Sequence, residues 1–77
     1  MRTGLEHTTP EALELLVNNL KSGTFLAIEK TDSAAFELDM TLLQIFEAEF
    51  LRRDMDFDGF IGDKLRTIID NWLEARE

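Results

Sequence analysis

The spacing of large apolar side chains constrains the fold of this chain more than any other feature. These side chains recur every three or four residues in three separate segments, as in helices that bury one face. The clearest stripe comprises Ile61, Leu65, Ile68, Ile69, Trp72 and Leu73. We therefore expect a mainly α fold, a small bundle of three principal helices over about residues 10–21, 40–53 and 60–76.

The first predicted helix has recognisable ends. Thr8 or Thr9 can cap its N-terminus, and Pro10 suits its first turn. Gly23 follows the apolar stripe, and glycine commonly ends a helix in the left-handed conformation. The sequence therefore predicts a helix that stops shortly before Gly23.

Residues 24–38 are ambiguous. Two short apolar runs flank the polar residues Thr31, Asp32 and Ser33, which is typical of a short β-hairpin. Equally, Asp32 or Ser33 can cap a helix that continues through Met40. We expect this segment to form either an additional helix or a short β-hairpin.

The composition indicates one folded domain over residues 1–77, with residues 1–8 frayed. A chain of 77 residues with 44% hydrophobic residues can build a single small core, but it has no cysteine to reinforce that core. No apolar run is long enough to span a membrane, and the first residues lack the apolar stretch of a secretory leader. The expected location is therefore cytoplasmic.

The net charge restricts the choice of partner. A formal charge of −8 disfavours direct binding to nucleic acid or to an anionic membrane, because both would repel the chain. A basic protein surface or a cation is the electrostatically favoured partner.

Three carboxylates alternate along a segment between two predicted helices: Asp54, Asp56 and Asp58, followed directly by Gly59. In this order the segment resembles the first part of the calcium loop of EF-hand proteins. The resemblance implies that the three carboxylates would hold Ca²⁺. No other cofactor is expected.

The resemblance ends before the loop does. Leu65 stands at the loop position where EF-hands have a bidentate glutamate, and Asp63 is the available substitute ligand. The simpler alternative needs no metal: Asp58 or Gly59 caps the last helix, and the carboxylates lie near its positive end.

Catalytic chemistry has little support in the sequence. The one histidine, His7, precedes the first predicted helix and has no obvious orienting acid. Glu47 and Glu49 fall on different sides of their helix, so they do not form a general acid–base pair. We expect no catalytic residues and no enzymatic activity.

Two groups of residues are candidates for an interaction surface. Leu15, Leu38 and Ile45 lie off the main apolar stripes, which predicts a second buried surface in a homo-oligomer or a complex with another protein. If the acidity is functional, a set of carboxylates should cluster on one exposed face; this set is Glu29, Glu37, Asp39, Glu47 and Glu49.

The predicted function is therefore interaction. The chain is expected to be a small acidic module that acts as a regulator, adaptor or inhibitor by binding another protein surface. In one version its carboxylates mimic the charge of nucleic acid. The alternative function is a single-site calcium-binding module that uses the degenerate loop Asp54–Asp63.

Overall fold

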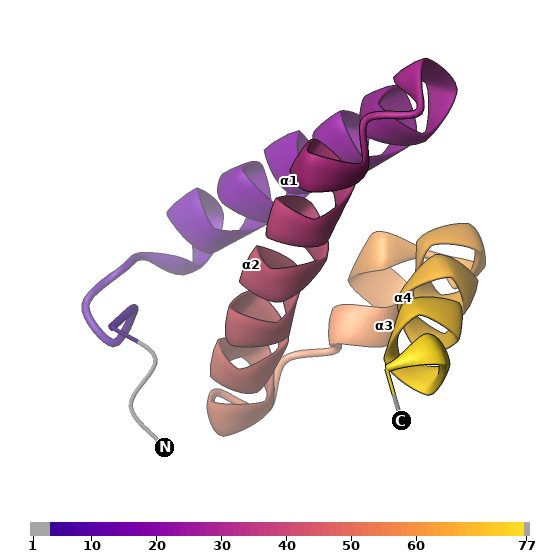
Figure 1. Ribbon diagram of the computed structural model, residues 1–77. Helices are drawn as coiled ribbons and strands as arrows, with labels where there is room; N and C mark the ends of the chain where they lie inside the picture. The colour runs from indigo at the N-terminus through magenta and orange to yellow at the C-terminus, as the bar shows by residue number, and fades with distance from the viewer. Residues whose placement is uncertain (1–3, 77) are drawn as a thin grey trace.

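The computed structural model describes residues 4–76, which form four helices and no strand (Figure 1). α1 (Pro10–Lys30) and α2 (Ser33–Arg52) make an antiparallel hairpin. The short α3 (Phe57–Ile61) leads into α4 (Asp63–Ala75), and both lie on one side of that hairpin. The predicted mainly α bundle is confirmed. None of the helices in the described range is long and apolar enough to cross a membrane.

Residues 24–38 form neither a separate helix nor a hairpin of strands, but complete the two long helices. α1 passes through Gly23 and ends at Thr31, which has the left-handed φ of 56°. The prediction that Gly23 ends the helix is therefore wrong. Asp32 caps α2, because its Oδ1 accepts a hydrogen bond from the backbone N–H of Ala35 at 3.1 Å.

The helix continues beyond Gly23 because its next turns reach the core. Thr24 and Ala27 are buried on the same side of α1 as Leu13 and Val17. The buried hydroxyl of Thr24 donates to the carbonyl of Leu20 at 2.8 Å, so it leaves no unsatisfied donor inside the protein. Burial of two further turns outweighs the weak helix propensity of one glycine, which amounts to about 1 kcal/mol.

Gly23 provides a test of this packing. A Cβ atom at this position would lie 3.1 Å from Oδ2 of Asp39, whose side chain is partly exposed and can rotate away. We therefore expect Gly23→Ala to raise the free energy of unfolding by about 0.5 kcal/mol, since alanine restricts the unfolded chain. Urea denaturation measures this change. A loss of stability would show that Asp39 cannot move.

The core lies where the hairpin meets α3 and α4. The largest buried apolar side chains come from all four helices: Leu13, Val17, Met40, Leu43, Phe46, Phe50, Phe57, Ile61, Leu65 and Ile69. The Phe50 ring packs edge-on against Phe57, with 5.2 Å between ring centroids, and also contacts Phe60. These aromatic contacts attach the short α3 to the end of α2.

The predicted last helix is divided in two. Gly62, with a φ of 86°, separates α3 from α4, and α4 begins without a side-chain cap. Asp56 caps α3 by accepting a hydrogen bond from the backbone N–H of Gly59 at 3.0 Å. The expectation that Asp58 or Gly59 caps the last helix is therefore wrong. Thr9, one of the two candidates, caps α1.

Candidate functional site

The most distinctive surface lies along one side of the α1–α2 hairpin. A shallow groove of about 230 Å³ runs between the two helices and is lined by Leu16, Asn19, Leu20, Leu42 and Phe46. Four apolar side chains flank it: Leu15 and Leu26 on α1 are 62% and 49% exposed, and Leu38 and Ile45 on α2 are 59% and 38% exposed. We call this surface the outer face; it comprises Leu15, Leu16, Asn19, Leu26, Leu38, Leu42, Ile45 and Phe46.

The outer face points away from α4, which contacts the hairpin elsewhere. Nζ of Lys64 lies 5.2 Å from the ring centroid of Phe25 in α1, and Arg66 bonds Glu47 of α2. Phe25 and Glu47 project from different sides of their helices than the residues of the outer face, as the helical period requires. The packing of α3 and α4 therefore leaves the outer face uncovered.

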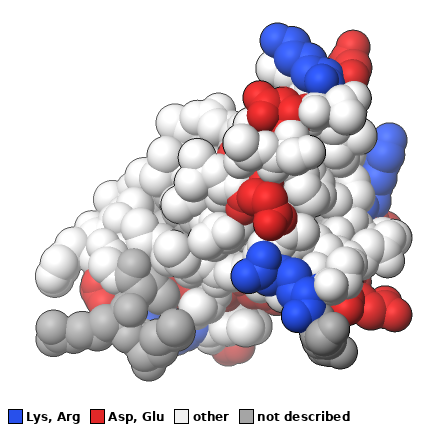
Figure 2. Space-filling view, in the orientation of Figure 1, with Lys and Arg blue, Asp and Glu red and all other residues white. Residues whose placement is uncertain are grey.

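Charged side chains are almost absent from this side of the hairpin. From residue 12 to 26 of α1 and from 34 to 46 of α2, the outward positions are 12, 15, 16, 19, 20, 23 and 26, and 34, 35, 38, 41, 42, 45 and 46, and none of these is charged. The same arcs reach charged residues only at the helix ends, at Lys30 of α1 and at Glu49, Arg52 and Arg53 of α2. The corresponding region, over α1 and α2 on the left of Figure 2, is almost entirely white. In a chain with 31% charged residues, such a surface is unlike ordinary solvent-exposed helix.

Asp39 adjoins one end of the groove. It lies one turn before Leu42 on α2 and next to Gly23 of α1. Partial burial raises the pKa of the Asp39 carboxyl, because desolvation disfavours the charged form. Any partner that covers the groove would further reduce the solvent exposure of the Asp39 carboxylate.

The sequence located part of this surface. Leu15, Leu38 and Ile45 are exposed and belong to the outer face, but Leu16 and Leu26 were missed. Leu16 follows the fully buried Leu13 by three residues, so helical spacing would place it beside the core, yet it is 41% exposed. Leu26 follows Leu15 by eleven residues, which is about three helical turns, so both project from the same side of α1. The expected end of the helix before Gly23 concealed this relation.

The five predicted carboxylates do not form one exposed cluster. Glu29 is exposed near the end of α1, whereas Glu49 is fully buried, which corrects the expectation that it faces solvent. Glu47 accepts a hydrogen bond from Nη1 of Arg66 at 2.9 Å. Glu37 accepts one from the indole N–H of Trp72. These carboxylates, apart from Glu29 and Asp39, have partners within the protein.

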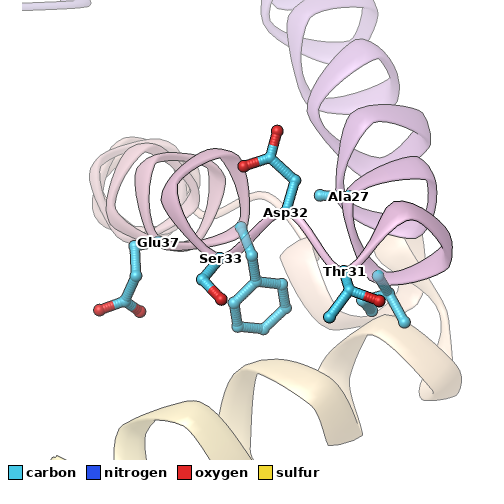
Figure 3. Close-up of a pocket in the computed structure, with 7 residues that line it drawn as sticks. Ala27, Thr31, Asp32, Ser33 and Glu37 are labelled. Atoms are coloured by element: carbon cyan, nitrogen blue, oxygen red, sulfur yellow. The ribbon is translucent and has the colours of Figure 1, made fainter.

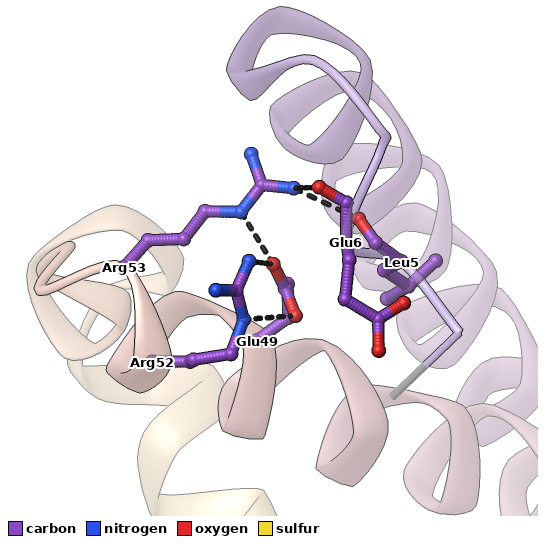
Figure 4. Close-up of polar contacts among 5 residues, drawn as sticks. All are labelled: Leu5, Glu6, Glu49, Arg52 and Arg53. Atoms are coloured by element: carbon purple, nitrogen blue, oxygen red, sulfur yellow. Dashed lines mark hydrogen bonds and ion pairs between the residues drawn. The ribbon is translucent and has the colours of Figure 1, made fainter. Parts of the chain in front are cut away.

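Glu49 is the centre of a buried ionic cluster (Figure 4). Its Oε1 accepts a hydrogen bond from Nε of Arg52 at 3.0 Å, and its Oε2 accepts one from Nε of Arg53 at 2.5 Å. Nη2 of Arg53 also donates to the backbone carbonyls of Leu5 at 2.8 Å and Glu6 at 3.4 Å. This cluster fastens the N-terminal segment to the C-terminal end of α2, a contact that sequence spacing could not reveal.

Arg66 and Trp72 attach α4 to the rest of the protein. Nη1 of Arg66 lies 2.9 Å from both Glu47 of α2 and Asp58 of α3, and Nη2 lies 3.0 Å from Asp70. Desolvation lowers the pKa of Arg66, but the hydrogen bonds with Asp58 and Glu47 and the charges of Glu47 and Asp70 together outweigh it, so the pKa is raised. Trp72 is partly buried against the core, as its stripe predicted.

The acidic loop uses its carboxylates for structure. Asp56 caps α3, Asp58 pairs with Arg66, and Asp54 has the left-handed φ of 60°. Asp63 lies in the first turn of α4. Within residues 4–76, no three acidic, histidine or cysteine side chains come together in a way that could hold a metal ion. Calcium binding here stays a prediction. The observed contacts give Asp56 and Asp58 a structural role that needs no metal.

Calcium should therefore leave the stability of the protein unchanged, and the cap should matter instead. We expect Asp56→Ala to cost about 1 kcal/mol, because the N–H of Gly59 loses its acceptor, whether or not Ca²⁺ is present. Thermal melts with calcium and with chelator measure both effects. A melting temperature that rises by several degrees with calcium, and no longer does so in Asp56→Asn, would establish the metal site.

A second hollow lies at the turn between α1 and α2 (Figure 3). This cleft has a volume of about 400 Å³ and is lined by Ala27, Ile28, Thr31, Asp32, Ser33, Phe36 and Glu37. The carboxylates of Asp32 and Glu37 point in different directions. Binding sites for small molecules usually have a few polar groups that converge on the ligand, and this cleft does not show that arrangement.

Comparisons of the chain with protein-family models, with curated proteins and with solved structures give no significant match.

Proposed function

We propose that this chain is a cytoplasmic, non-enzymatic interaction module that acts as a regulator, adaptor or inhibitor by binding another protein surface. The observation that supports this function is the outer face, on which Leu15, Leu26, Leu38 and Ile45 are exposed together without charged neighbours. Contiguous apolar patches of this kind are uncommon on soluble proteins that do not use them for binding.

The shape of the outer face favours a protein over a small ligand. The groove between α1 and α2 is shallow, and its flanks are ridges of leucine and isoleucine side chains at helical spacing. Helices pack by setting the ridges of one surface into the grooves of another. A partner that presents an apolar helical surface would therefore fit.

The net charge affects how fast partners associate with the chain. A charge of −8 steers the chain toward basic partners and away from acidic ones, which affects association rates more than affinity. Mimicry of nucleic acid would need exposed carboxylates at regular spacing. Glu47 and Glu49 are instead paired with arginines of the same chain, so we assign the binding energy to the outer face.

A comparison of pull-downs tests this function. Immobilised protein, incubated with native extract, should retain a specific partner that resists high salt, because apolar contacts are not screened. Leu38→Glu/Ile45→Glu should lose this partner, whereas Leu51→Glu should keep it. Leu51 is the matched control: it is 66% exposed on the opposite side of α2. Retention of every partner by the outer-face variant would contradict the proposed function, and loss of the partners in high salt alone would favour charge mimicry.

A further inference from the structure

The features of the outer face also indicate which kind of protein covers it. We propose that its occupant is a second copy of this chain, so that two α1–α2 hairpins pack face to face as a four-helix arrangement. This inference rests on the proposed function, because it names the partner of the same surface. Three features of the outer face support it: its shape, its size and its charge.

The outer face carries both a recess and protruding side chains, which a contact between two identical surfaces needs. It presents a groove between α1 and α2 together with protruding side chains on both flanks, Leu15 and Leu26 on one and Leu38 and Ile45 on the other. In a twofold dimer the same patch appears on both partners, so it must contain both the protrusions and the recess that receives them. Two antiparallel hairpins joined in this way have the architecture of a four-helix bundle.

The size of the outer face suits a weak, reversible dimer. Its uncharged positions span residues 12–26 of α1 and 34–46 of α2, about 20 Å of each helix at 1.5 Å per residue, and neighbouring helices lie about 10 Å apart. The outer face thus offers about 400 Å² per copy, or about 800 Å² for a dimer, which is the range of weak and transient contacts. We therefore expect a dissociation constant on the order of hundreds of micromolar.

The charge pattern favours a second copy over a basic partner. A basic partner would be bound best by an apolar patch with carboxylates around it. The flank of the outer face on α2 is formed by Ala34, Thr41 and Ala48. Glu37, which is bonded to Trp72, lies between the first two, and Arg52 lies at the end of the flank. The charged residues on the α1 flank are Glu11, Glu29 and Lys30, all near the ends of the helix.

Two acidic copies can meet only where their own charges are absent. The chain as a whole carries −8, so most of its surfaces would repel a second copy. The outward positions of residues 12–26 and 34–46 carry none of that charge. Asp39 adjoins the groove, and Lys30, Glu49, Arg52 and Arg53 lie at the ends of the outer face. The raised pKa of Asp39 is compatible with further burial, since the neutral form of a carboxyl costs less to desolvate.

The test uses pairs of variants with opposite charge. Sedimentation equilibrium of the wild type up to several hundred micromolar should show a reversible monomer–dimer equilibrium. Leu38→Lys/Ile45→Lys and Leu38→Glu/Ile45→Glu should each be monomeric at the same concentrations, with at least tenfold weaker association. An equimolar mixture of the two variants should recover dimers, because opposite charges then face each other. Leu51→Lys should dimerise as the wild type does.

Other outcomes would overturn the inference. A wild type that remains monomeric at these concentrations excludes the second copy as occupant. Dimers that persist in both double variants would place the contact elsewhere, and a mixture that stays monomeric would show that the faces do not meet. All substitutions are at exposed helical positions, and circular dichroism must confirm that each variant is folded as the wild type is.

The failure of this inference is distinguishable from failure of the proposed function. A monomeric wild type whose salt-resistant partner is lost in Leu38→Glu/Ile45→Glu would refute self-association and leave the interaction module intact. A dimer that retains no partner from native extract would support the second copy and contradict the regulator or adaptor function.

Discussion

Phe50→Ala should cause a larger loss of stability than the other substitutions, lowering the free energy of unfolding by about 3–5 kcal/mol. Phe50 is 1% exposed and contacts both Phe57 and Phe60, so its removal opens a cavity between α2 and α3. Replacing a buried phenylalanine by alanine costs about 3–5 kcal/mol. At the usual 0.05–0.15 kcal/mol per residue, a domain of 77 residues has only about 4–12 kcal/mol in total.

The neighbouring residue provides the control for this prediction. Leu51 is 66% exposed, so Leu51→Ala should change the free energy of unfolding by no more than about 0.5 kcal/mol. Urea denaturation followed by circular dichroism measures both variants under the same conditions. Similar stabilities for the two variants would mean that the aromatic contacts between α2 and α3 do not hold the fold together.

Glu49→Ala should have the next largest effect, with a loss of about 3 kcal/mol. The Glu49 carboxylate is fully buried, and its removal leaves the guanidinium of Arg53, 15% exposed, bonded only to backbone carbonyls. Removal of one partner from a buried ion pair costs about 3–5 kcal/mol, because the remaining charge stays desolvated. We expect the lower end of that range, since Arg52 reaches solvent.

A double-mutant cycle separates the ion pair from simple packing. Arg53→Ala should also be destabilising, but Glu49→Ala/Arg53→Ala should lose less than the sum of the two, because neither charge is then left alone. Hydrogen exchange adds a local measurement: Arg53→Ala should release the amide of Thr8, which bonds the carbonyl of Leu5, whereas Arg52→Ala should not. Strict additivity of the two substitutions would contradict the cluster in Figure 4.

Sequence periodicity predicted the helical core well, because core positions repeat with the helical period. Ile61, Leu65 and Ile69 belong to the apolar stripe identified in the sequence, and all three are buried. The ends of the helices were less predictable. Gly23 carries a local stop signal, yet the burial of Thr24 and Ala27 farther along overrides it. Thr31, a residue with no such signal, adopts the left-handed conformation that ends α1.

The candidate site was only partly predictable for a similar reason. Leu38 and Ile45 depart from the stripe of their own helix, so a second apolar side of α2 was visible in the sequence. The groove depends on how α1 packs beside α2, and it combines Leu16 of one helix with Phe46 of the other. Asp58 pairs with Arg66, eight residues away in another helix, so only the folded chain shows this contact. Arg52 and Arg53 lie three and four residues after Glu49 in the same helix, but the burial of Glu49 and the bond from Arg53 to Leu5 also depend on the folded chain.

Site-specific photo-crosslinking tests most directly whether the outer face is the docking surface. A photoreactive phenylalanine analogue at position 38 lies on the outer face, and the same group at position 51 lies on the opposite side of α2. The two proteins, in native extract at equal concentration, should differ sharply: position 38 should form discrete crosslinked products, with a second copy or with another protein, and position 51 should form none. Crosslinks from position 51 without any from position 38 would contradict the account.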